Sequence, residues 1–201
     1  MTKRDLLDKA IDACERLRGI EYRITVGKNN SETEIVLTFP VSRFHHMLGL
    51  HKLKDVNYLN SGGGRNKERI YQAVLQNDYG LRDKITNSNF VDEIIPRLCA
   101  ITKLEGLLDN NEETYYSKSN YFSVFNHIDY DFAFHVIDES LHVSFYFAKE
   151  AGAGGQARYV MVSTFENEVP PGHCRRPHTL LRKAKIDKAS GTTKILFECR
   201  K

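Results

Sequence analysis

The spacing of hydrophobic residues divides the chain into two parts. In the first half, apolar side chains recur every three or four positions, as in amphipathic helices; from about residue 121 they alternate with polar ones, as in strands. The helical spacing predicts helices over residues 2–19, 43–52 and 66–77, and a longer one that follows Asn87 or Ser88. Thr2 can cap the first helix, Ser42 can cap the second, and Pro96 should kink the last.

Strand-forming residues predict a hairpin early in the chain and a meander late in it. Residues 21–26 and 34–39 flank Gly27–Asn30, which is typical of a hairpin turn, and Pro40 ends the second run. The alternating runs of the second half cover residues 132–137, 141–147, 158–165, 179–187 and 193–198.

These elements predict an α+β fold in a single domain, residues 1–201. A helix-rich N-terminal half packs on an antiparallel sheet from the C-terminal half. The expected parts are an N-terminal helix and hairpin over 1–40, a helical part over 41–110 and the sheet over 121–199, with loops at 61–64 and 110–118.

Composition points to a protein that is not inserted in a membrane. Hydrophobic residues make up 41% and charged residues 27% of the 201 residues, and no apolar run approaches the roughly 18 residues that span a bilayer. The charged start of the chain lacks the apolar segment of a secretory signal, so we expect a cytoplasmic protein. Its four cysteines are scattered without a Cys-x-x-Cys pair, which indicates reduced thiols.

Charge is distributed unevenly. Residues 101–150 contain three Lys and Arg against nine Asp and Glu, whereas residues 151–201 contain ten against four. The basic last quarter either meets phosphate groups or is a solvated face that pairs with the acidic stretch.

Three segments partly match cofactor-binding or metal-binding motifs, but none has the spacing or the ligands that such a site needs. Ser61–Lys67 lacks the spacing of a phosphate-binding P-loop. Gly152–Gly155 lies between two predicted strands, so no helix follows it to hold a dinucleotide. His173, Cys174 and His178 are too few ligands for zinc. We therefore expect neither a cofactor nor a metal.

The densest polar chemistry lies between Phe44 and Lys52. His45, His46, His51 and Lys52 offer groups for proton transfer near neutral pH and for stabilising phosphate charge. If the segment is one helix, His51 falls within the apolar arc, and His45 shares the polar side with Lys52. The alternative is a buried short helix whose imidazoles are satisfied by hydrogen bonds.

A second candidate lies on the predicted sheet. His142, Ser144 and Tyr146 align on one face of their strand, either as a ligand-binding floor or as solvent-facing residues.

The third candidate is the basic strand near the C-terminus. There, His178 and Arg182 project to one face, and Lys183 and Lys185 project to the other. Because the two pairs lie on opposite faces of the strand, at most one pair can bind a given ligand.

The segment Phe44–Leu53 resembles a phage-associated family of nucleases in the barnase, EndoU, colicin and RelE-like class. Its pattern is a strand ending in Phe, followed by Phe-x-His-hydrophobic-x-Gly-Leu-x-Lys-Leu. Ile70-Tyr71, a long apolar helix ending at Leu107-Leu108, and the late strand Tyr159–Phe165 extend the resemblance over about residues 35–187. The resemblance implies helices packed on a curved antiparallel sheet. It also implies metal-independent cleavage of RNA, often by a toxin in conflicts between phages, mobile elements and bacteria.

The resemblance also implies roles for particular residues. His46 stands at the motif's histidine as general acid or base, Lys52 is the phosphate-stabilising cation, and His51 is an alternative proton donor. The residues assigned to substrate binding are His45, Ser163, Thr164, His178 and Arg182. RNA is the implied substrate, because it alone supplies an internal 2′-hydroxyl nucleophile. An immunity or antitoxin protein is the second implied partner.

Two other functions remain open at this point. One is a non-catalytic nucleic-acid-binding or protein-binding module on the same fold. The other is a small-molecule enzyme that uses the same histidines, although no cofactor motif accompanies it.

Overall fold

A computed structural model describes residues 1–60, 66–111, 113–117, 129–138, 141–151, 157–166 and 177–199. The helices are α1 (Lys3–Arg18), α2 (Val41–Met47), α3 (Asn57–Asn60), α4 (Lys67–Leu75), α5 (Leu81–Thr86) and α6 (Ile95–Asn110), with 3₁₀ turns η1 (Leu50–Lys52), η3 (Asp78–Gly80) and η4 (Val91–Glu93). The strands are β1 (Ile20–Lys28), β2 (Ser31–Thr38), β3 (Thr114–Ser117), β4 (Phe132–Asp138), β5 (Leu141–Ala151), β6 (Ala157–Glu166), β7 (Thr179–Asp187) and β8 (Thr193–Glu198). The predicted loops at 61–64 and 152–155 and the pair His173-Cys174 lie outside the described residues.

The N-terminal helix and hairpin form where their sequences predict them. The Thr2 side chain accepts a hydrogen bond from the Asp5 backbone, and the Asp5 carboxylate accepts one from the Thr2 backbone, which makes a capping box. In the β1–β2 hairpin, Asn29 and Asn30 form the two-residue turn with φ of 50° and 61°. Asparagine tolerates this left-handed conformation better than most residues, which explains its place at the turn.

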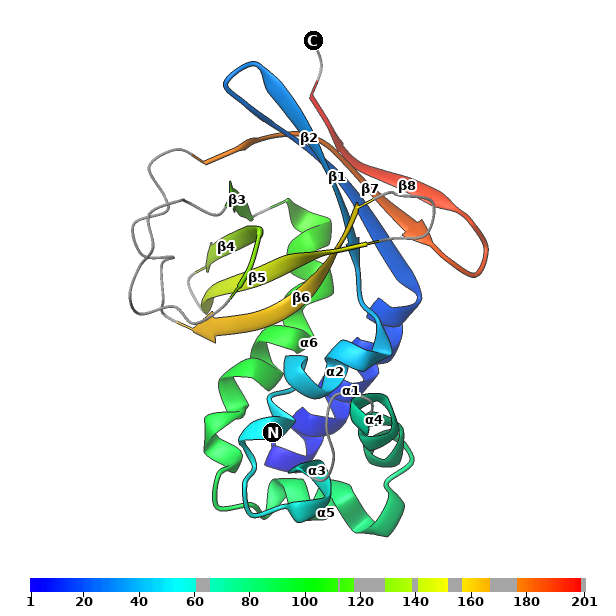
Figure 1. Cartoon of the computed structure of the whole chain (residues 1–201), viewed down its shortest axis with the longest axis vertical. Helices are drawn as coiled ribbons and strands as arrows, with labels where there is room; N and C mark the ends of the chain where they lie inside the picture. Colours follow the sequence, from blue (N-terminus) through cyan, green and yellow to red (C-terminus); the bar gives the residue numbers. More distant parts are fainter. Residues whose placement is uncertain are drawn as a thin grey trace.

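All the described strands belong to one eight-stranded sheet, and the expected α+β architecture is confirmed. The strand order is β3-β4-β5-β6-β2-β1-β7-β8, so the early hairpin lies in the middle of the later meander (Figure 1). The pair β2–β6 is parallel, and every other pair is antiparallel. The sheet also curls: His178, just before β7, donates its backbone N–H to the carbonyl of Tyr115 in the edge strand β3, which brings these two distant strands together.

Strand β3 and the start of α6 differ from the sequence-based expectation. Residues 110–118 were expected to form a loop, but residues 114–117 pair with β4. The expected kink at Pro96 is wrong, because η4 and Ile94 precede the helix and Pro96 lies in its first turn. A proline there loses no hydrogen bond, since the first N–H groups of a helix have no partner within it.

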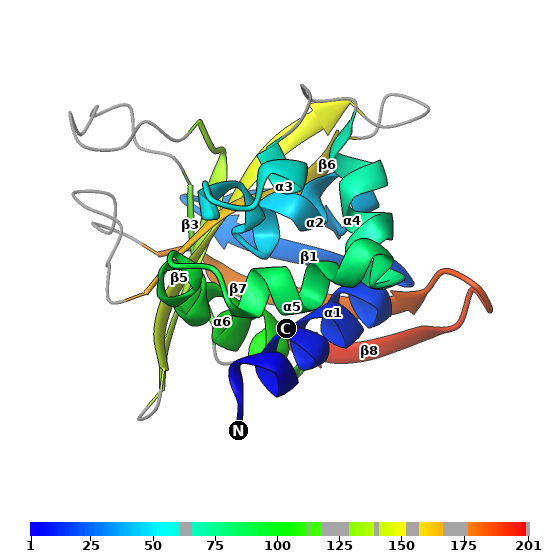
Figure 2. The same cartoon turned by 90° about the horizontal axis from the view of Figure 1, so that it is seen from below.

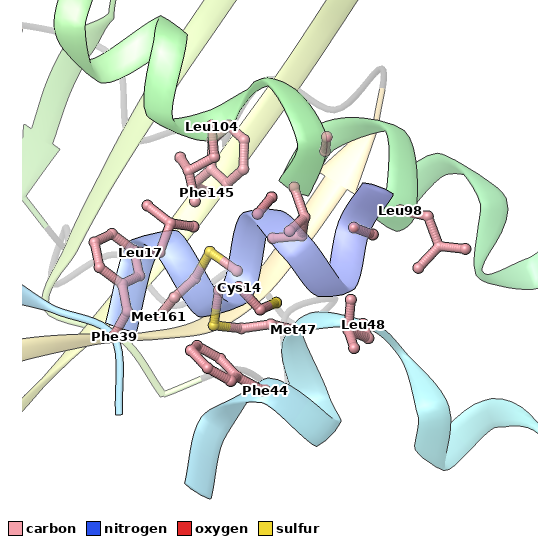
Figure 3. Packing of buried hydrophobic residues seen from close by; sticks show 14 of the residues in the cluster. Cys14, Leu17, Phe39, Phe44, Met47, Leu48, Leu98, Leu104, Phe145 and Met161 are labelled. Carbon is pink, nitrogen blue, oxygen red and sulfur yellow. The ribbon is translucent and has the colours of Figure 1, made fainter. Parts of the chain in front are cut away.

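The helices gather at one end of the sheet, below it in Figure 1 and in front of it in Figure 2. Between them lies one large apolar core (Figure 3). Cys14 of α1, Phe44 of α2, Leu104 of α6 and Phe145 of β5 meet there, all fully buried. The α2 helix is therefore fixed between the other helices and the sheet. No helix among the described residues is long and apolar enough to cross a membrane.

A buried ion pair lies where the curled sheet meets the end of α6. Lys183 of β7 and Glu113, which follows α6, form an ion pair with side chains 0% exposed. Lys183 Nζ also donates to the Leu108 carbonyl at 2.8 Å, and the Tyr115 hydroxyl donates to Glu113. As the sequence predicts, Lys185 shares this face, where it pairs with Glu105 and Asp109 of α6. These contacts tie the sheet to the last turns of α6.

Candidate functional site

The segment that carries the predicted catalytic residues is a helix broken by a glycine. α2 ends at Met47, Gly49 is left-handed with φ of 74°, and η1 follows. The expected continuous helix over 43–52 is therefore wrong, and so are the faces assigned to His45 and Lys52. Ser42 is not the cap either, since it lies inside α2, which begins after Pro40.

Gly49 also makes room for a neighbouring side chain. A Cβ atom at this position would lie 3.0 Å from Arg97 Cδ and 3.0 Å from Ile94 Cγ2. The glycine thus turns the chain back and lets Arg97 pass beside it. This is a physical reason for the glycine in the Phe44–Leu53 motif.

Replacing Gly49 with alanine should lower the free energy of unfolding by about 2–4 kcal/mol, because a Cβ adds left-handed strain and overpacking. Urea denaturation followed by circular dichroism measures this change. Gly106→Ala is the matched control, since a Cβ there would meet nothing within 4 Å. In this helical position alanine should stabilise the protein by about 0.5–1 kcal/mol. Equal effects of the two substitutions would contradict the role given to Gly49.

The break brings two imidazoles into contact. His46 Nδ1 and His51 Nδ1 lie 3.2 Å apart, and both residues are partly exposed. His45 is different, because it is only 4% exposed and its Nε2 donates to the Leu59 carbonyl at 3.0 Å. The structure therefore supports His46 and His51 as candidates for proton transfer and gives His45 a buried, structural contact.

Two cations that sequence reasoning missed stand beside these histidines. Lys67 Nζ, at the start of α4, donates to His46 Nε2 at 2.6 Å. Arg97, in the first turn of α6, donates to the His46 carbonyl at 3.2 Å and to Ser163 Oγ on β6 at 3.5 Å. Its guanidinium also lies 5.9 Å from the centre of the Phe165 ring. A sequence clue existed for Arg97, because it shares a helical face with buried Ile101 and Leu104.

Lys52 is the third cation of the site. Its Nζ donates to the Glu93 carbonyl at 3.5 Å, and the charge of Arg97 contributes to lowering its pKa, after burial. Across the described ranges, no carboxylate lies within ion-pair distance of Lys52, Lys67 or Arg97. The charge of Glu93 acts on Lys52 without forming an ion pair. Three cations thus surround two imidazoles, and none of the three is in an ion pair with a described carboxylate.

This environment keeps the imidazoles neutral. Burial, followed by the charge of Lys67, lowers the pKa of His46 to about 4. Burial, followed by His46 and Arg97, lowers the pKa of His51 to about 4. Burial also lowers the pKa of the Arg97 guanidinium. At pH 7 the site therefore combines neutral imidazoles with positive charge.

Of the other residues predicted to bind substrate, only Ser163 contacts the candidate site. Ser163 joins the site through Arg97. Thr164 is buried, and its hydroxyl lies 3.8 Å from Met161 Sδ in the core. His178 lies at the seam between β3 and β7, with its ring 5.5 Å from that of Phe132. Arg182 is exposed and pairs with Glu198 of β8 at 3.5 Å.

The polar row on β5 is buried and does not face solvent. Ser144 and Tyr146 are 0% and 1% exposed. The Ser144 hydroxyl lies 2.7 Å from His135 Nδ1 on the neighbouring strand. The side chain of His142 is outside the described part of the structure.

His45, His46 and His51 are also the group, among the described residues, that could hold a metal ion. One ring nitrogen of each lies within 4.8 Å of the others. However, the ammonium of Lys67 occupies His46 Nε2, and Arg97 lies close by. The site therefore suits an anion better than a cation.

Comparisons with known proteins identify the family of the chain. No curated protein and no solved structure gives a significant match to the chain. One family model, described as phage-Barnase-EndoU-ColicinE5/D-RelE like nuclease4, matches residues 6–194. The match confirms the resemblance that the sequence indicated over about residues 35–187, and extends it to residues 6–194. The chain belongs to this family of phage barnase, EndoU, colicin E5/D and RelE-like nucleases.

Proposed function

We propose that this nuclease is a metal-independent endoribonuclease. The observation that carries the proposal is Arg97, a residue only 9% exposed, whose guanidinium lies beside His46 and pairs with no carboxylate of the described residues. A buried charge without a partner is costly, and arginine matches phosphate oxygens in charge and geometry. A phosphate at this position would supply the missing countercharge to Arg97, Lys67 and Lys52.

The neutral imidazoles supply the second requirement. In RNA cleavage the 2′-hydroxyl attacks the adjacent phosphorus, and the 5′-oxygen leaves with a proton. His46 and His51 are within reach of the cations that would hold such a phosphate. Bound phosphate would offset part of the positive charge, whereas burial, the largest cause of the lowered pKa values of both imidazoles, would remain.

The substrate is inferred from the charged groups of the site, which are cations without a cluster of acidic ligands. Cations without an acidic ligand cluster favour charge stabilisation by the protein itself over a bound metal. RNA has an internal nucleophile, its 2′-hydroxyl, and can therefore be cleaved without a metal-activated water, whereas DNA lacks that group. The toxin role, the immunity or antitoxin partner and the cytoplasmic location stay predictions from the resemblance.

The test is cleavage of a labelled RNA oligonucleotide in EDTA. We expect products that end in 2′,3′-cyclic phosphate, and no cleavage of a strand with 2′-deoxyribose at the scissile position. His51→Asn should lower kcat/KM about 10²–10⁴-fold, the usual contribution of a general acid or base.

Two results would contradict the proposal. Cleavage that requires added Mg²⁺ or Mn²⁺ would indicate a different reaction. Salt-dependent RNA binding without any product would favour a non-catalytic binding module on this fold.

A further inference from the structure

We propose that Lys67, His46 and His51 form a directional proton relay, in which His51 Nε2 is the atom that protonates the leaving oxygen. The inference rests on the proposed function and assigns a role to each member of the histidine pair. In it, His51 is the catalytic residue, whereas His46 and Lys67 are positioning residues that act through His51.

Lys67 sets the direction of the relay, because it can only donate a hydrogen bond to His46. A lysine ammonium has three donors and no acceptor. His46 Nε2, at 2.6 Å from Lys67 Nζ, must therefore accept the hydrogen bond and carries no proton.

The second step fixes both tautomers. A neutral imidazole has one N–H, so the proton of His46 is on Nδ1. That atom faces His51 Nδ1 at 3.2 Å, which must accept. The proton of His51 is then on Nε2, at the far end of the hydrogen-bonded series from Lys67.

His45 is not part of the series of hydrogen bonds that joins Lys67, His46 and His51. Since a carbonyl only accepts, its Nε2 is the protonated atom that donates to Leu59 at 3.0 Å. Its other nitrogen, Nδ1, is buried and has no hydrogen-bond partner among the described residues. The adjacent histidines of the motif thus have opposite tautomers, which separates the structural His45 from the relay member His46.

The relay answers a chemical difficulty of the site. At a pKa of about 4, almost no histidinium exists at pH 7, so neither imidazole alone can be an effective acid. The Lys67 ammonium is the proton donor that the series of hydrogen bonds connects to His51.

The protons balance in a single concerted step. As the P–O5′ bond breaks, its electron pair stays on O5′, which takes the proton from His51 Nε2. His51 Nδ1 takes the proton of His46 Nδ1, and His46 Nε2 takes one from Lys67, which is left as an amine. The 2′-hydroxyl proton leaves to water as the P–O2′ bond forms. Water then returns a proton to His51 Nε2, His51 Nδ1 gives its proton back to His46 Nδ1, and His46 Nε2 gives its proton back to the Lys67 amine, which restores the starting tautomers.

The first test measures the tautomers without reference to activity. Long-range ¹H–¹⁵N spectra of ¹⁵N-histidine protein at pH 7 should show Nδ1–H for His46, and Nε2–H for His45 and His51. Asn substitutions of each histidine assign the signals. An Nε2–H tautomer at His46 would overturn the relay.

The second test changes the proton source. Lys67→Arg keeps a charged donor and hence the His46 tautomer, but a guanidinium does not release its proton. Lys67→Arg and Lys67→Met should both lower kcat for RNA about 10²-fold or more, with little change in KM. Lys84→Met, an exposed lysine of α5, is the control and should match the wild type.

The third test removes the need for an acid. A ribonucleoside 3′-(4-nitrophenyl phosphate) has a leaving group that departs without a proton. The losses in Lys67→Met and His51→Asn should nearly disappear with this substrate, whereas a loss in Arg97→Met should persist.

The outcomes separate the relay from the proposed function. Full activity of Lys67→Arg on RNA, or equal losses on both substrates, would overturn the relay while leaving the ribonuclease intact. A wild-type protein that cleaves neither substrate would overturn the proposed function, and the catalytic role of the relay with it.

Discussion

Replacing Arg97 with methionine should lower kcat/KM for RNA cleavage about 10²–10³-fold, and leave the free energy of unfolding unchanged or raised. The activity falls because the variant loses a cation that would stabilise the phosphate charge. The Arg97 guanidinium lies between α2 and β6, where it donates hydrogen bonds to the His46 carbonyl and to Ser163. The stability does not fall, because the variant no longer buries a charge that lacks a countercharge among the described residues.

Two measurements check this combination. Cleavage of a fluorogenic RNA gives kcat/KM, and urea denaturation gives the free energy of unfolding. Arg23→Met is the control, since Arg23 is an exposed arginine of β1 that pairs with Glu21 on the surface. It should change neither quantity by much. Full activity of Arg97→Met would contradict the catalytic role of Arg97, and a loss of several kcal/mol in stability would show that Arg97 has a structural role instead.

Replacing Lys183 with methionine should destabilise the protein by about 3–5 kcal/mol, the largest stability effect that we expect. The substitution leaves Glu113 fully buried without its cation, and burial raises the pKa of that carboxyl group. It also removes the donor to the Leu108 carbonyl at the end of α6. The midpoint of urea denaturation measures the loss.

A second variant isolates the charge. Lys183→Met combined with Glu113→Gln removes both charges and should recover at least half of the lost stability. Lys194→Met, at an exposed position of β8, should stay within about 0.5 kcal/mol of the wild type. If the double variant is as unstable as Lys183→Met alone, packing rather than charge explains the effect.

Local patterns were sufficient for most of the fold. The capping box of α1 and the Asn29-Asn30 turn are made by neighbouring residues, so the sequence contains all of their chemistry. The later strands were predicted because alternation depends only on which face is buried. The parallel pairing of β2 with β6 could not be predicted in this way, because it joins segments about 120 residues apart.

The candidate site was predicted only in part. The histidine segment stands out because three imidazoles and a lysine occur within eight residues. The helical wheel failed beyond Met47, because it assumes a continuous helix, and Gly49 ends that regularity with its left-handed φ. Lys67 and Arg97 could not be assigned, since their distance to His46 depends on how α4 and α6 pack.

The sequence by itself determined where most of the helices and strands form, and which short segment holds the imidazoles of the candidate site. It could do so because periodicity, capping and turn chemistry act over a few residues. Only the tertiary structure decided the protonation and the charge around those imidazoles. The pKa of a group and its tautomer depend on burial and on the donors nearby, and the core brings Lys67 and Arg97 to His46 from 21 and 51 residues away.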